Sequence, residues 1–250
     1  MAAEAPSFSH SLTFVSGNVG KIREVTEILS LHGIKVHSCK LDLPEVQGDL
    51  EAIARAKLDY ACKHVDGAVL VEDSALGFDA MHGLPGPYIR HFLDKLGSTG
   101  LIQMLDGFKS KSATAECMFA YSDGSEDHNV TIASAKVAGV IVDQPRGKSG
   151  FGWDDILMPA STTQTFAEMS EEVKNACSHR RDALVALCKE LKSDKPRKIV
   201  NLKCAACGLD IGTTTNDGVR CCHRNHMIWH IACLPKEDPD CANLKKRKKA

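Results

Sequence analysis

A short segment of small and polar residues with a lysine at its end joins an apolar run to a helical pattern: Ser16, Gly17, Asn18, Val19, Gly20 and Lys21. The N-terminus of a helix offers free backbone N–H groups and the positive end of the helix dipole, so this junction can bind phosphate, and Lys21 adds a full charge. It is not a P-loop, because its glycines are too close together and Ile22 follows the lysine. A strand–turn–helix corner without a ligand would have the same pattern, so both interpretations stay open at this point.

Acidic residues follow two of the apolar segments. Glu45 comes after the second of them, and Glu72 and Asp73 directly follow the apolar segment 68–71. Ligands gather at the carboxyl ends of strands in α/β sheets, so acidic side chains there are candidates for a site. Converging carboxylates favour a hard cation such as Mg²⁺, which prefers oxygen ligands and keeps waters. The alternative is that Glu72 and Asp73 only cap the next turn.

Two clusters further along the chain combine rings with hydrogen-bonding groups. One is Phe151, Gly152, Trp153 and Asp154, and the other is His179 and Arg180 at the start of the last helical pattern. An aromatic ring beside a hydrogen-bonding side chain suits a flat heterocycle. Core packing and a solvated helix start are the alternatives for each cluster alone. Together with the phosphate segment and the carboxylates, the clusters predict a pocket for a nucleoside triphosphate.

The C-terminal part carries paired metal-ligand residues: Cys204, Cys207, His230 and Cys233. Thiolates and an imidazole at these spacings can close a tetrahedral zinc site, which we expect to be structural. Four further candidates leave a second ion or another ligand set open: Cys221, Cys222, His223 and His226.

Charge and cysteine content divide the 250 residues into two parts. Residues 1–194 hold 19 Lys and Arg against 27 Asp and Glu, whereas residues 195–250 hold 12 against 5. Six of the 11 cysteines lie in the short basic part, which is close to the size at which a fold needs a metal or disulfide. We predict a globular domain over 1–191, a basic linker over 192–203, a zinc-binding module over 204–241 and a basic tail over 242–250.

The composition excludes several classes of protein. With 43% hydrophobic and 25% charged residues, the chain is not collagen-like, of low complexity or wholly disordered. No apolar run approaches the roughly 20 residues that span a bilayer, and the first ten residues lack the features of a secretory signal. We expect a soluble cytoplasmic protein with reduced cysteines. The basic run 245–249 makes the nucleus a second expected location.

Apolar spacing predicts alternating strands and helices in the large domain. A hairpin signal at Asp123-Gly124 separates two long apolar segments, so we expect an α/β fold with a mixed sheet. The expected strands are 12–15, 34–38, 68–71, 113–121 and 130–142, and the expected helices lie between 18 and 33 and over 50–64, 88–96 and most of 170–191.

Five motifs, in order and spacing, resemble the inosine triphosphate pyrophosphatases, the eukaryotic branch of the Ham1 family. They are SGNxxK at 16–21, DLPE at 42–45, VEDSALGFDAMHGLPGPYIRHFL at 71–93, FGWD at 151–154 and KNAxSHR at 174–180. The resemblance covers residues 12–191. It implies an elongated mixed α/β fold with the pocket between two lobes. It also implies a homodimer that hydrolyses ITP, dITP and XTP to the monophosphate and pyrophosphate with Mg²⁺, for which Mn²⁺ substitutes.

The same resemblance assigns roles to residues. It implies that residues 16–21 and Lys57 bind the phosphates, that Glu45, Glu72 and Asp73 bind magnesium, and that Asp73 also activates water. Residues 151–154 and Lys174 would contact the base and substrate, and His179 and Arg180 would recognise the 6-keto group. Physically, Lys21 and Lys57 would neutralise charge on the leaving pyrophosphate. A donor facing O6 would meet an amino group in adenine, which disfavours ATP.

Two positions depart from the family pattern. Asp155 stands where the family has proline, and Leu157 replaces an aromatic residue. We expect the turn under the base to be looser and substrate choice to be affected.

The tail resembles the zinc finger of poly(ADP-ribose) polymerases and DNA ligase III, although only 22 residues separate Cys207 from His230. A PHD-like or RING-like site is the alternative. With the basic run 245–249, this resemblance predicts that the tail tethers the enzyme to nucleic acid. A solvated charge run without a partner stays an alternative. The competing function is a zinc-dependent DNA- or protein-binding protein whose nucleotide pocket is vestigial or a sensor.

Overall fold

The structure is a computed structural model that describes residues 11–125, 129–193, 222–224 and 227–229. The chain divides into two units, Met1–Ser193 and Asp194–Ala250. The predicted zinc ligands Cys204, Cys207, His230 and Cys233, nearly all of the predicted linker and the basic run 245–249 lie outside the described residues.

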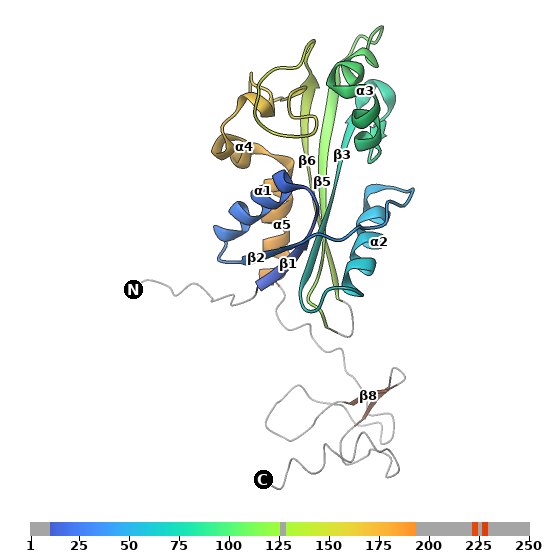
Figure 1. Ribbon diagram of the computed structural model, residues 1–250, viewed down its shortest axis with the longest axis vertical. Helices are drawn as coiled ribbons and strands as arrows, with labels where there is room; N and C mark the ends of the chain where they lie inside the picture. The colour runs from blue at the N-terminus through green and yellow to red at the C-terminus, as the bar shows by residue number, and fades with distance from the viewer. Residues whose placement is uncertain (1–10, 126–128, 194–221, 225–226, 230–250) are drawn as a thin grey trace, which may run out of the picture. The chain divides into compact units, whose positions relative to one another are not determined.

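The first unit is built on a mixed sheet, as the sequence predicts (Figure 1). Its central strand order is β2-β1-β3-β5-β6-β7, with β4 paired to β3. The two pairings of β1 are parallel and all others in this sheet are antiparallel. The strands are β1 (Ser11–Val15), β2 (Lys35–Cys39), β3 (Val69–Phe78), β4 (Pro85–Gly86), β5 (Ser112–Ser122), β6 (Val130–Ile141) and β7 (Leu157–Pro159).

Helices cover both faces of this sheet (Figure 1). On one face, α1 (Val19–Ser30) and α5 (His179–Ser193) pack their apolar residues against Phe14 of β1 and Phe119 of β5. On the other face, α2 (Leu50–Cys62) packs Ala54 and Leu58 against Val71 of β3. A third apolar cluster joins α3 (Ile89–Gln103) to the far ends of the long strands. Burial of these apolar side chains drives the layers together.

Strand β3 is longer than the sequence predicts, and this difference places the carboxylates. The prediction ended the strand at Val71, but β5 pairs with all ten residues of Val69–Phe78. Glu72 and Asp73 therefore lie within a strand and not after its end. Successive side chains of a strand point to opposite faces, so Glu72 points toward the α1 and α5 side and Asp73 toward the α2 side.

The edge of β3 that faces away from β5 is only partly paired. It pairs with β1 at Val69 and Leu70 and with β4 at Leu76 and Gly77. Among the described strands, none pairs with this edge at residues 71–75. Side chains from both faces of the sheet can therefore reach one opening.

Four other features differ from the prediction. Helix α3 continues to Gln103 through a kink at Gly97, whose φ of 66° is readily adopted by glycine. The short strands β4 and β7 carry no clear sequence signal. The last helical stretch is divided at Ser178, which has extended backbone, into α4 (Glu171–Cys177) and α5. As predicted, His179 and Arg180 open the last helix.

The second unit contains an antiparallel pair, β8 (Cys222–Arg224) and β9 (Met227–Trp229), which the sequence analysis did not predict. Within the residues that the structure describes, no helix is both long and apolar enough to cross a membrane.

Candidate active site

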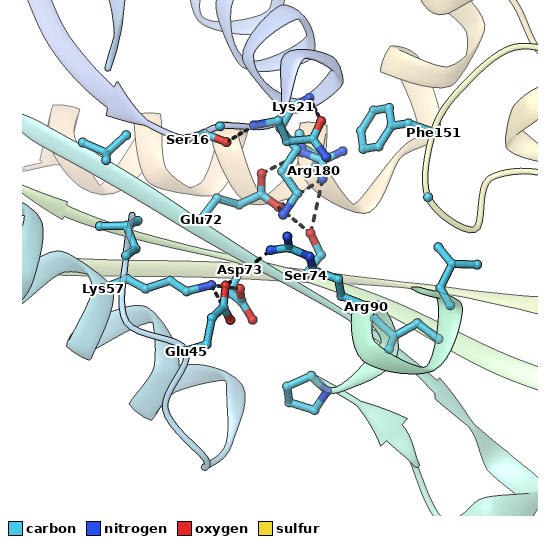
Figure 2. Close-up of a pocket in the computed structure, with 18 of the residues that line it drawn as sticks. Ser16, Lys21, Glu45, Lys57, Glu72, Asp73, Ser74, Arg90, Phe151 and Arg180 are labelled. Carbon is cyan, nitrogen blue, oxygen red and sulfur yellow. Dashed lines mark hydrogen bonds and ion pairs between the residues drawn. The ribbon is translucent and has the colours of Figure 1, made fainter. Parts of the chain in front are cut away.

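A cavity of about 610 Å³ opens at the partly paired edge of β3 (Figure 2). Its volume lies within the range of small-molecule and cofactor sites. It is lined by the turn before α1, the segment after β2, the N-terminus of α3, the 151–154 turn and the start of α5. The carboxyl ends of the parallel strands β1 and β2 lie beside this opening. Ligands of α/β sheets collect at the carboxyl ends of parallel strands.

The turn before α1 is held in place by hydrogen bonds from its backbone to its own side chains. Asn18 caps the helix, because its side chain accepts a hydrogen bond from the Lys21 N–H at 3.1 Å. The Ser16 Oγ accepts from the Asn18 N–H at 3.2 Å. The first turn of α1 carries no acidic residue, so the positive end of its dipole is not neutralised there. This arrangement favours an anion.

On the α2 side of β3, a lysine joins two carboxylates. The Lys57 Nζ lies 2.5 Å from the Asp73 Oδ1 and 3.4 Å from the Glu45 Oε2. Burial raises the pKa of Asp73 even though Lys57 and Lys21 act to lower it. A carboxylate with a raised pKa is a better proton acceptor than an exposed one. Asp73 is therefore suited to act as a base.

On the opposite face, Glu72 is engaged by cations. The Arg180 Nε and Nη2 donate to its two oxygens at 3.0 Å each, and the Lys21 Nζ lies 3.1 Å from its Oε1. Ser74 also donates to it. Burial disfavours the charged form of Glu72, but these contacts outweigh burial and hold its pKa well below the usual range. Glu72 therefore fits the expected metal site less well than Glu45, because its side chain is 1% exposed and both of its oxygens accept hydrogen bonds from Arg180, whereas the ion pairs of Glu45 are 3.4 and 3.5 Å long and exposed.

Glu45 and Asp73 are the pair that fits magnesium. Both contact the same lysine, and the side chain of Glu45 is 49% exposed. Mg²⁺ needs only one or two carboxylates when substrate phosphates and waters complete its shell. Within the described ranges, no group of three or more His, Cys, Asp or Glu side chains forms a metal site.

Glu24 on α1 is a buried acidic residue that the sequence analysis missed. It accepts from Arg180 Nη1 and lies 2.7 Å from the Lys174 Nζ. Lys174 in turn lies 2.6 Å from the Asp154 Oδ2, and burial raises the pKa of Asp154. The side chains of all four residues are at most 6% exposed. The only signal for Glu24 is its position one turn before the apolar Ile28, which is weak.

His179 is buried at the cavity wall without a hydrogen-bond partner for either ring nitrogen among the described residues. Its ring centroid lies 5.2 Å from that of Trp153 and 6.0 Å from that of Phe166. Burial, with a contribution from Arg180, lowers its pKa well below the usual value, so the ring is neutral. A neutral imidazole has one donor and one acceptor nitrogen. Such a group is costly to bury unpaired, so it is available to a ligand.

Hydrogen bonds connect the 151–154 turn to its surroundings. The Asp154 carboxylate accepts from the Phe151 N–H at 2.8 Å. Asp155, which we expected to loosen the turn, accepts a hydrogen bond from the Ser98 Oγ at 2.9 Å, and its carbonyl accepts from the Arg146 N–H at 2.8 Å. Asp155 is thus held by Ser98 beside the α3 kink, and the expectation of a looser turn stays a prediction.

Phe151 lies over the cations of the site. Its ring centroid is 4.5 Å from the Lys174 Nζ and 5.5 Å from the Arg180 guanidinium carbon. The ring also fills the space where a Cβ on Gly20 would lie, so Gly20 is required for close packing of α1 against the turn. Figure 2 shows Phe151 and Arg180 on one side of the cavity and Lys57 and Glu45 on the other.

Most predicted site residues of the large domain line this cavity. They are Ser16, Gly17, Asn18, Lys21, Glu45, Lys57, Glu72, Asp73, Phe151, Gly152, Trp153, Asp154, His179 and Arg180. Val19, Gly20 and Lys174 are not among the lining residues: Val19 is exposed, Gly20 lies under Phe151, and Lys174 is buried behind the turn. Lys40 and Arg90 also line the cavity and were missed, because single basic residues after a strand or in a helix are common.

Comparison with known proteins places the first unit. A sequence model described as the Ham1 family matches residues 12–190. The inosine triphosphate pyrophosphatase of Yarrowia lipolytica is 52% identical over 177 residues, covering 71% of this chain and 93% of that protein. That of Mycosarcoma maydis is 47% identical over 180 residues, covering 71% and 92%.

Solved structures of Ham1 proteins have a fold similar to that of the first unit. The Ham1 protein of Staphylococcus aureus has a TM-score of 0.63 at 27% identity, covering 74% of this chain and 100% of that one. The HAM1 protein of Coxiella burnetii has a TM-score of 0.64 at 27% identity, covering 73% and 98%.

Proposed function

The chain belongs to the Ham1 family, and we propose that it hydrolyses non-standard purine nucleoside triphosphates such as ITP, dITP and XTP to the monophosphate and pyrophosphate. As a nucleoside-triphosphate pyrophosphatase it cleaves between the α- and β-phosphates. The observation that carries the substrate class is the buried, neutral His179, whose ring nitrogens are without partners beside Trp153. A purine base that packs against these rings would supply the missing hydrogen bond.

The base preference follows from hydrogen-bond polarity. Arg180 donates four hydrogen bonds to Glu72, Glu24 and Ser74, and a guanidinium has five N–H groups. One N–H of Arg180 and the donor nitrogen of His179 are therefore available to face O6 of hypoxanthine or xanthine. In adenine the same position carries an amino group, and two donors facing each other leave buried groups unpaired. We propose that this mismatch excludes ATP.

Asp73 is the proposed base for the attacking water. Its carboxylate is mostly buried, and its raised pKa favours acceptance of a proton. Lys57 acts to lower the pKa of Asp73 against burial and, with Lys21, lies where negative charge would develop on the leaving pyrophosphate. Glu45 and Asp73 would hold Mg²⁺, which when bound supplies further charge neutralisation of the phosphates. Glu72 orients Arg180 and Lys21 by its contacts with both.

The first experiment measures pyrophosphate release from ITP, dITP, XTP, GTP, ATP and UTP with Mg²⁺ by the full chain. We expect turnover of the first three, and a fall of kcat by about 100-fold or more for Asp73→Asn, since removal of a positioned base costs about that much. Asp66→Asn, in the exposed loop before β3, is the matched control and should retain activity. Release of orthophosphate, equal turnover of ATP, or an active Asp73→Asn would contradict the proposal.

For the second unit, we propose a structural zinc ion on Cys204, Cys207, His230 and Cys233 and contact of the basic tail with nucleic acid. The support for this is the residue spacing and the basic excess of the sequence. Truncation after Leu191 should abolish salt-sensitive binding of nicked duplex DNA while hydrolysis is retained. Absence of such binding in the full chain would overturn the tether. We also propose a homodimer, which light scattering of the full chain would test.

A further inference from the structure

Lys40 lies beside the phosphate-binding turn although it is distant from it in sequence. The Ser16 N–H donates to the Cys39 carbonyl at 3.0 Å, which continues the parallel pairing of β1 and β2 to the residue before Lys40. The Lys40 side chain then passes Gly17, where a Cβ would lie 3.7 Å from the lysine Cε. Lys40 is exposed and lines the cavity.

The charges around the cavity are almost all paired. Lys21 pairs with Glu72. Lys57 pairs with Asp73 and Glu45, Arg90 pairs weakly with Glu45 and Asp94, and Arg180 pairs with Glu72 and Glu24. Among the described lysines and arginines that line the cavity, Lys40 is the one with no carboxylate within 4.0 Å. Its charge is therefore available to an anion without the loss of an existing ion pair.

The position of Lys40 fixes which end of a nucleotide it meets. The base end is marked by Phe151, Trp153 and His179, whereas Lys40 lies with Ser16 and Gly17 at the carboxyl ends of β1 and β2. Figure 2 shows Ser16 and Phe151 on different sides of Lys21. A triphosphate whose base lies at Phe151 can therefore extend its β- and γ-phosphates past Lys21 toward Lys40.

We propose that Lys40 binds the β- and γ-phosphates and then the pyrophosphate that leaves, which deepens and rests on the proposed function. Cleavage breaks the bond between the α-phosphorus and the bridging oxygen, and that oxygen departs with the pyrophosphate while water supplies the new oxygen of the monophosphate. Negative charge therefore grows on the leaving group, and an unpaired ammonium beside it stabilises that charge.

The test measures binding of inorganic pyrophosphate and of IMP to the full chain by calorimetry with Mg²⁺, and kcat/KM for ITP. We expect Lys40→Gln to weaken pyrophosphate binding about tenfold, the effect of one partly screened charge contact, and to leave IMP binding unchanged. Lys40→Arg should restore most of the affinity. Lys35→Gln, an exposed lysine at the other end of β2 that does not line the cavity, is the matched control.

The outcomes separate the two proposals. Failure of the wild type to release pyrophosphate from ITP overturns the proposed function, yet the pyrophosphate affinities of wild type and Lys40→Gln still decide the role of Lys40. Equal pyrophosphate affinities in those two proteins overturn it. The role of Lys40 is also overturned if Lys40→Gln loses as much affinity for IMP as for pyrophosphate. Lys40 would then act on both products by long-range electrostatics and not by contact with pyrophosphate.

Discussion

The charged side chains at the base end of this cavity are all buried, whereas those at the phosphate end are partly buried and partly exposed. At the base end, Glu24, Lys174, Asp154 and Arg180 have side chains at most 6% exposed, and each has a charged partner. At the phosphate end, Lys57 and Asp73 are also mostly buried, but Glu45 and Arg90 are 49% and 74% exposed. The ion pairs at the base end are thus shielded from water, whereas those of Glu45 and Arg90 can be exchanged for phosphate and metal.

This difference has an energetic meaning. A buried ion pair gains little over an apolar core, but removal of one partner leaves an uncompensated buried charge. Exposed pairs are screened by water and salt and contribute little to stability. Substitutions at the base end should therefore lower stability, and those at the phosphate end should mainly change catalysis.

The largest expected effect is that of Arg180→Ala. It leaves Glu72 and Glu24 buried without their shared cation, so the free energy of unfolding should fall by about 3–5 kcal/mol. Urea unfolding followed by circular dichroism measures this loss. Arg181→Ala removes the adjacent residue, whose pair with Asp182 is about 44% exposed, and should change stability by about 0.5 kcal/mol or less. Equal unfolding midpoints for the two variants would contradict the comparison.

Lys57→Gln tests the phosphate end. Asp73 can take up a proton when its partner is lost, so we expect a smaller destabilisation of about 1–3 kcal/mol. In the wild type, Lys57 acts to lower the pKa of Asp73 against the effect of burial. The substitution of Lys57 should therefore raise that pKa. Because Asp73 must be ionised to accept a proton, the acid limb of kcat/KM should move to higher pH.

A pH profile of kcat/KM with ITP measures this shift. Lys63→Gln, at the exposed end of the same helix, is the control and should keep the wild-type profile. An unchanged acid limb in Lys57→Gln would mean that Asp73 is not the titrating base.

The smallest effect concerns the bond that links α3 to the base end. Ser98→Ala and Asp155→Asn should each lower stability, and a double-mutant cycle should give a coupling of about 0.5–1.5 kcal/mol for their hydrogen bond. Thr99→Ala, next to Ser98 and exposed, should show no coupling to Asp155→Asn. Zero coupling for Ser98 would mean that the turn is held by its backbone contacts alone.

The local parts of the fold could be predicted because their signals lie close together in the chain. The apolar run before Ser16, the cap at Asn18 and the stop at Gly33 define a strand and a helix within about twenty residues, and the structure has both. Strand β3 could not be bounded in this way. Its extension through Glu72 and Asp73 depends on pairing with β5, more than forty residues later.

The residues of the candidate site also divide into those that the sequence could predict and those that it could not. The motifs contain most of its residues, because groups that bind one ligand are often held by one turn, as in the segments 16–21 and 151–154. Glu24 and Lys40 could not be found from motifs. Each matters only through neighbours from other elements, Arg180 and Lys174 for Glu24 and Gly17 for Lys40.

Periodicity, caps and motif spacing are properties of neighbouring residues, so most strands and helices and the chemical types at the site could be predicted from the sequence. The pairing of the charges could not, because it depends on the folded structure. Alternation along β3 sends Glu72 to Arg180 and Asp73 to Lys57, on opposite faces of one sheet. Arg180 and Lys21 then hold the pKa of Glu72 well below its usual range against the effect of burial, whereas burial raises the pKa of Asp73. The electric field at a side chain depends on distances through space and on the exclusion of water. Neither quantity can be obtained from the order of residues in the chain.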